Sequence, residues 1–204
     1  MIEVNIQSND RLKDSFQKKE GAILFIPEQY FLALQVNDCS AKFDLALRAG
    51  VLKYLSQRMR LVYEKEVGTT KVPQWKPNAV FSLEKQQLLP KFEDRSKSRD
   101  CTLLVRQPGF LTESFIKEAY KEIKRSNCHP LFEEIEFVTT GSRLCSQIIH
   151  SGSTEKLAES LALLDQFVQQ HHYEYADQYF REIDLVGSSG QKILRCNVRV
   201  VNSA

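Results

Sequence analysis

The sequence lacks any long hydrophobic run. No stretch of about 18 apolar residues is present, which is the length that a helix needs to cross a bilayer. The first residues, Met1–Asn5, also lack the basic and apolar regions of a secretory signal. We therefore expect a cytoplasmic protein without a membrane partner.

Cysteines are few and scattered. They form no Cys-x-x-Cys pair, and Cys128 and His129, which are adjacent in the chain, rarely point at one metal. We expect no metal, no cofactor and only reduced thiols, as in a reducing compartment. The five cysteines are Cys39, Cys101, Cys128, Cys145 and Cys196.

The common signatures of enzymes are missing too, because the sequence has no Gly-rich phosphate loop, nucleophile elbow or HExxH motif. Neither sign of charge is in excess, since 28 basic residues stand against 26 acidic ones. A net charge of +2 gives no reason to expect nucleic acid as a direct partner. These absences favour a binding protein and leave an enzyme open.

What the sequence does contain is a repeated order of strands and helices. Each half has an apolar strand, a short polar turn, a helix with apolar residues at steps of three and four, and further strands. This order predicts an α+β fold of duplicated β-α-β-β units with mostly antiparallel sheet. The predicted elements are strands over 22–26 and 30–36, a helix from Phe43, strands over 101–105 and 143–150, a helix over 157–168, and strands over 179–185 and 192–201.

The domain organisation follows from the same pattern. Residues 1–20 are a polar lead-in, and residues 21–204 are expected to form a single domain, because no Gly/Ser-rich linker divides them. Its halves cover about 21–105 and 132–204, joined by a helix over 112–126 with Thr112 as N-cap. Residues 65–99 have three prolines and a charged run, and we expect an excursion over one face that ends in a solvated loop.

Two positions have chemical interest. His150 ends a predicted strand before a glycine turn, where it either lines a pocket or only fixes the turn. Glu182 stands in a largely apolar and aromatic strand, with Phe180 on its face. It either faces solvent or forms a charge at the base of a ligand cleft, since burying an unpaired carboxylate is costly.

Four stretches resemble the GyrI-like family of small-molecule-binding domains, which also occurs as the effector-binding domain of multidrug-responsive regulators. Leu104–Thr112 is similar to the family's strand, Arg-Gln-Pro motif and helix start, and Leu144–Gly152 is similar to its Leu-Cys-Val-Gln-Ile-Leu-His-Ile-Gly. Phe180–Leu185 is similar to His-His-Glu-Ile-Tyr-Leu, and Lys192–Arg195 precedes a final strand. The resemblance covers about residues 22–200.

The resemblance implies two pseudo-symmetric halves around a central ligand cleft, with Glu182 at its floor. It also implies a stand-alone form, because the chain has no room for the helix-turn-helix domain that the regulators add. Some stand-alone relatives are similar to cyclopropanoid hydrolases, which use carboxylates and aromatic residues of the cleft. Here Lys76 replaces the acid and Ala79 an aromatic residue, and Phe180 and Arg181 replace two histidines, which weighs against a two-carboxylate mechanism.

We therefore expect the cleft to bind a small hydrophobic or cationic aromatic molecule, with Glu182 as counter-charge. One alternative is a hydrolase that acts on a reactive small molecule, and another is a protein-interaction module of the gyrase-inhibitor type, with a protein partner. His150 and Gln147 are expected to fix the cleft rim. The expected ligand-binding residues are Glu182, Phe180, Tyr179, His150, Gln147, Trp75 and Phe110.

Overall fold

The computed structural model describes residues 21–68, 83–89, 100–153, 156–185 and 190–201. They form two compact units that interleave along the chain. Unit 1 takes its residues from 1–28, 86–95 and 141–204, and unit 2 takes its residues from 29–85 and 96–140. The units therefore divide the chain differently from the two halves expected from the sequence, because the first strand groups with the carboxy-terminal part.

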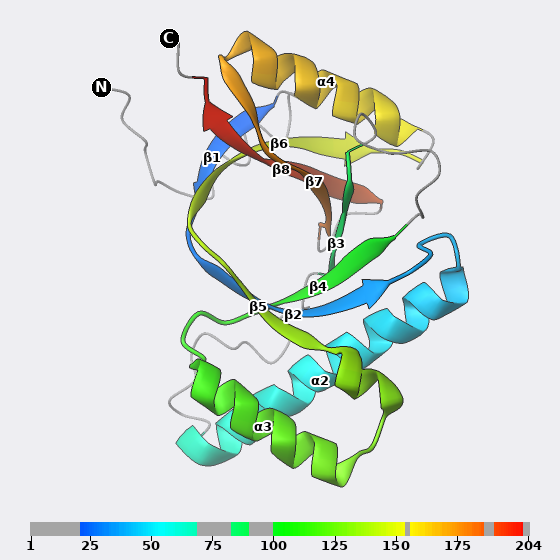
Figure 1. Ribbon diagram of the computed structural model, residues 1–204, viewed down its shortest axis with the longest axis vertical. Coiled ribbons are helices and arrows are strands. Elements are labelled where there is room, and N and C mark those ends of the chain that lie inside the picture. Colours follow the sequence, from blue (N-terminus) through cyan, green and yellow to red (C-terminus); the bar gives the residue numbers. More distant parts are fainter. Residues whose placement is uncertain (1–20, 69–82, 90–99, 154–155, 186–189, 202–204) are drawn as a thin grey trace. The chain divides into compact units, whose positions relative to one another are not determined.

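Unit 1 is an antiparallel sheet with one helix. The helix α4 (Leu157–Gln170) packs on β6 and β7 (Figure 1). Its apolar face buries Leu161 and Leu164 against Phe180 of β7 and Leu194 of β8, so the core of this unit lies between α4 and the sheet. The strands of unit 1 follow the order β1 (Ala22–Ile26), β6 (Arg143–Ser151), β8 (Gln191–Val200) and β7 (Tyr173–Asp184).

Unit 2 has a larger helical layer. Helix α2 packs on strands β2 and β4 and on helix α3, and the apolar core of the unit lies between these helices and the strands (Figure 1). Strand β3 (Leu83–Leu88) contains the point where the chain passes from unit 2 to unit 1. The other elements are β2 (Gln29–Val36), α2 (Lys42–Val67), β4 (Cys101–Gln107), α3 (Glu113–Ser126), the 3-10 helix η3 (Pro130–Glu134) and β5 (Glu136–Thr140).

The repeated order predicted from the sequence is confirmed. The chain runs β2-α2-β3-β4 and later β6-α4-β7-β8, and in both cases the last strand pairs with the first one. The fold class is therefore α+β with antiparallel pairing. The central ligand cleft that was expected with this fold stays a prediction.

Helix α3 begins where the sequence predicted. The side-chain oxygen of Thr112 accepts a hydrogen bond from the backbone N–H of Phe115 at 3.2 Å, which satisfies one of the free donors at a helix start. Its apolar stripe then buries Ile116, Ala119 and Ile123 in the core of unit 2. The N-cap and the apolar periodicity therefore indicate the same helix, and both stabilise it.

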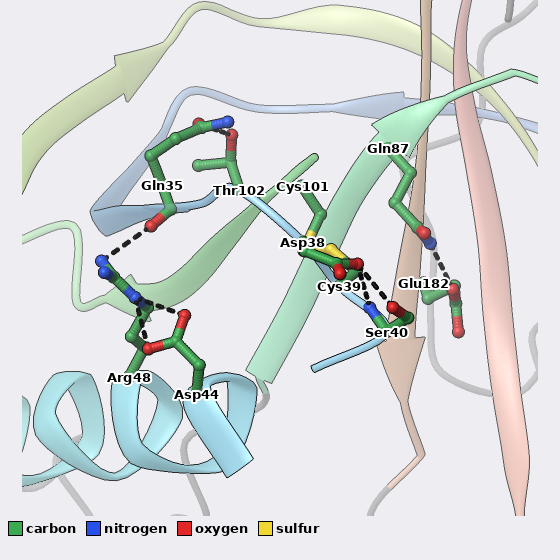
Figure 2. The surroundings of a disulfide bond; sticks show 10 residues. All are labelled: Gln35, Asp38, Cys39, Ser40, Asp44, Arg48, Gln87, Cys101, Thr102 and Glu182. Carbon is green, nitrogen blue, oxygen red and sulfur yellow. Dashed lines mark hydrogen bonds and ion pairs between the residues drawn. A yellow bond between two sulfur atoms is a disulfide. The ribbon is translucent and has the colours of Figure 1, made fainter. Parts of the chain in front are cut away.

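A disulfide joins Cys39 to Cys101, so the expectation of five reduced thiols is wrong for this pair (Figure 2). Val36 at the end of β2 lies opposite Cys101 at the start of β4, and the turn after β2 brings Cys39 back beside that strand. The two Cα atoms are 6.1 Å apart although the residues are 62 apart in sequence, a proximity that spacing along the chain does not show. The remaining cysteines are the exposed Cys128 and the buried Cys145 and Cys196, which form no disulfide.

Candidate functional site

The hairpin of β7 and β8 places Glu182 inside the sheet of unit 1. In the antiparallel register, Glu182 lies opposite Leu194, and Asp184 lies opposite Lys192. Directly opposed side chains of antiparallel strands point to the same face. Because Leu194 belongs to the core beneath α4, Glu182, Asp184 and Lys192 all project from the α4 face of the sheet.

The carboxylate of Glu182 is buried, and both of its oxygens accept hydrogen bonds. The residue is only 6% exposed, so the solvent-facing alternative does not hold. Oε1 accepts a hydrogen bond from Gln87 Nε2 at 2.5 Å, the contact drawn in Figure 2, and Oε2 accepts one from Lys192 Nζ at 2.7 Å. These bonds offset the cost of removing a charged carboxylate from water.

Lys192 supplies the positive charge at this site. Burial alone would lower its pKa, but the hydrogen bond and charge of Glu182, with a contribution from Asp184, raise the pKa above its ordinary value. The ammonium is therefore protonated at neutral pH and neutralises Glu182 within the chain. Its side chain remains 36% exposed, so this buried ion pair has one end in contact with solvent.

The two residues expected at the cleft rim lie on opposite faces of β6. His150 lies opposite Lys192, on the α4 face, and its Nδ1 is 2.9 Å from the hydroxyl of Ser160 in α4. Gln147 lies opposite Arg195 on the other face, and its Oε1 accepts two hydrogen bonds from that guanidinium, at 3.2 and 2.9 Å. Only His150 therefore shares a face with Glu182.

The remaining predicted ligand-binding residues are dispersed. Phe180 is 3% exposed and belongs to the core beneath α4, whereas Tyr179 is 45% exposed. Phe110 belongs to unit 2, where its ring lies 5.2 Å from that of Tyr63. Trp75 lies outside the described residues.

Lys192 and Gln87 are the site residues that the sequence reasoning missed as partners of Glu182. The sequence held no clear signal for Lys192, because the observed register pairs it with Asp184, whereas a symmetric turn over 187–190 would pair it with Leu185. Gln87 had no signal either. It falls in the stretch 65–99, where no strand was predicted.

Comparison with known proteins bears on the fold. No protein-family model matches this sequence, and no curated protein matches it. A solved hydrolase from Listeria innocua is similar at 20% identity and a TM-score of 0.67, over 93% of this chain and 98% of that one. The EcmrR C-terminal domain is similar at 16% identity and a TM-score of 0.50, over 89% of this chain and 98% of that one. This chain has a GyrI-like fold.

Within this GyrI-like fold, the Arg-Gln-Pro motif has a structural role. Gln107 is 2% exposed, and its Nε2 donates hydrogen bonds to the Ser56 hydroxyl in α2 and to the Val105 carbonyl, each at 3.0 Å. The motif therefore fastens β4 to α2 in the core of unit 2. Lys76 and Ala79, the two departures from the family pattern, lie outside the described residues.

Unit 2 of the GyrI-like fold also has an apolar hollow of about 390 Å³ beside α2. Gly50 and Tyr54 of α2 line it together with Phe132 of η3, and the rings of Tyr54 and Phe132 are stacked 6.4 Å apart. Phe43, near the start of the same helix, is 84% exposed. A protein-interaction role needs exposed apolar surface of this kind, so that alternative keeps one observation in its favour.

Metal clusters and membrane-spanning helices are absent from the part of the chain that the structure describes. There, no group of three or more His, Cys, Asp or Glu side chains is arranged to hold a metal ion. Among the same residues, no helix has the length and apolar character needed to span a membrane.

Proposed function

We propose that this protein binds a small amphipathic or aromatic cation, and that Glu182 is the counter-charge. One observation supports the proposal: a carboxylate lies buried within the sheet, on the face that carries the apolar core of unit 1, and pairs there with an ammonium. A buried ion pair is weak as a source of stability, because desolvation offsets most of its attraction. Recognition of charge is a function that such a group serves at the floor of an apolar site.

The fold is compatible with this role but does not assign it. Similarity to solved structures at 16–20% identity shows a shared architecture but does not indicate the ligand. The ligand class rests on the sign of the charge at Glu182 and on the apolar residues around it, since an organic cation can pair with the carboxylate while its apolar part stays out of water.

A thermal-shift screen tests the proposal even while the ligand is unidentified. Cationic dyes and aromatic drugs are added at rising concentration, and a compound at about a hundredfold its dissociation constant adds roughly 2.7 kcal/mol of stability. We expect stabilisation by lipophilic cations and little by their neutral analogues. Stabilisation by anions alone would contradict the proposal.

A hydrolase is the second candidate, favoured by a pair of carboxylates around one lysine. Lys192 Nζ lies 2.7 Å from Glu182 Oε2 and 3.8 Å from Asp184 Oδ1. A general base must be free to accept a proton, however, and both oxygens of Glu182 already accept hydrogen bonds. Turnover of a reactive small molecule that Glu182→Gln abolishes would favour the hydrolase over the binding protein.

A further inference from the structure

Lys192 occupies the place that a cationic ligand needs. Its ammonium is 2.7 Å from Glu182 Oε2, and Gln87 Nε2 bonds Oε1, so the carboxylate is neutralised before any ligand arrives. A cation that is to pair with Glu182 must therefore displace the ammonium of Lys192. The affinity that is measured includes the cost of this displacement.

Lys192 also has a second acceptor within reach. Its Nζ is 3.8 Å from Asp184 Oδ1, and the Asp184 side chain is 59% exposed. Asp184 lies directly opposite Lys192 in the β7–β8 register, whereas Glu182 lies diagonally across from it. Rotation of the lysine side chain can thus exchange the buried carboxylate for the exposed one without a change in the backbone.

We propose that Lys192 is an exchangeable internal counter-ion that sets the ligand specificity of the Glu182 site, and that it moves to Asp184 when a ligand cation binds. This inference rests on the proposed function. A ligand cation replaces the charge that Lys192 withdraws. A neutral ligand does not, so its binding leaves the Lys192–Glu182 pair in place.

The exchange has a direction that follows from burial. Glu182 is 6% exposed, so solvent screens its attraction to Lys192 poorly. Asp184 is exposed, so its attraction to Lys192 is well screened and weaker. The exchange is therefore unfavourable in the absence of a ligand. It becomes favourable only when a cation binds beside Glu182. Lys192 thereby lowers the affinity of the site for cations by the cost of its displacement and leaves the affinity for neutral aromatic molecules of the same shape unchanged.

Calorimetric titration of Lys192→Met at pH 8 tests the inference. The probes are tetraphenylphosphonium and its neutral analogue triphenylphosphine oxide. We expect tetraphenylphosphonium to bind about tenfold more tightly to this variant than to the wild type, since methionine keeps the apolar stem and removes the competing charge. The neutral probe should bind both proteins equally. Lys117→Met, which breaks an exposed ion pair with Glu113 in α3, is the matched control and should change neither affinity.

Two further measurements keep the test decisive if Lys192→Met folds poorly. Asp184→Asn removes the second acceptor from an exposed position, and it should weaken binding of tetraphenylphosphonium several-fold. In the wild type, saturating tetraphenylphosphonium should increase the rate at which Lys192 is acetylated, read by peptide mass spectrometry, because the ammonium moves toward solvent.

The outcomes separate the inference from the function on which it rests. If Glu182→Gln weakens cation binding but Lys192→Met and Asp184→Asn leave it unchanged, Glu182 is the counter-charge and the exchange by Lys192 is wrong. If Glu182→Gln leaves cation binding unchanged as well, the proposed function is wrong. Acetylation of Lys192 that does not change with ligand would also overturn the exchange.

Discussion

Removing the Cys39–Cys101 disulfide should lower the free energy of unfolding by about 4 kcal/mol. The bond closes a loop between residues 62 apart, and the chain-entropy model gives about 14 cal/mol/K for a loop of this length, which is about 4 kcal/mol at 25 °C. Cys101 is 3% exposed in the core of unit 2, so the crosslink is held where the native chain is well packed.

Urea unfolding of the wild type with and without a reducing agent measures this effect on one sequence. Cys39→Ala combined with Cys101→Ala should be as unstable as the reduced protein and should no longer respond to reductant. Alkylation of the denatured, unreduced protein counts the thiols directly: we expect Cys128, Cys145 and Cys196 to react and the other two to be protected. Five reactive thiols, or equal stability with and without reductant, would refute the reasoning.

Three smaller predictions follow from single residues. Gly21→Ala should destabilise by about 1–3 kcal/mol, because a Cβ there would overlap the Phe167 ring, whereas Gly50→Ala in α2 meets open space and should stabilise by up to about 1 kcal/mol. Urea midpoints of the two variants decide this, and equal shifts would contradict it. Thr112→Ala should cost about 1 kcal/mol through the lost helix cap, seen in the same assay. Because the pKa of Lys192 is raised, its stabilising effect is present below its ordinary pKa of 10.5 and is lost as pH rises through the higher folded-state value. The thermal stability of wild type and Lys192→Met should therefore converge above that pH, and a constant difference would contradict this.

The elements that the sequence predicted well have a clear apolar period. Strand β6 and helix α4 were placed within a residue or two, because each buries one regular face. Strand β3, Leu83–Leu88, was missed because its apolar and polar residues do not alternate and most of its side chains are charged or amide groups. Strand β7 was predicted to begin at Tyr179 but begins at Tyr173, and its pairing with β8 is irregular between Tyr175 and Phe180. That irregularity interrupts the alternation on which the prediction relied.

For the candidate site, the sequence pattern drew attention to Glu182 but did not indicate its surroundings. Glu182 was expected to share a face with Phe180, and the register puts both on the α4 face. The sequence did not predict that Arg181 and Ile183 are buried as well, because Arg181 interrupts the apolar run that is typical of a strand buried on both faces. The contacts with Gln87 and Lys192 depend on strand pairing, and pairing is a property of the folded chain.

Isothermal titration of wild type and Glu182→Gln against tetraphenylphosphonium and triphenylphosphine oxide tests the central claim most directly. Glutamine keeps the shape of Glu182 and removes its charge, so the cation should lose about 1–3 kcal/mol of binding free energy and the neutral probe little. Glu174→Gln is the matched control, because Glu174 lies on the same strand in an exposed ion pair with Arg199 and should not affect either probe. Equal losses for both probes in Glu182→Gln, or the same loss in Glu174→Gln, would contradict the assignment of Glu182 as counter-charge.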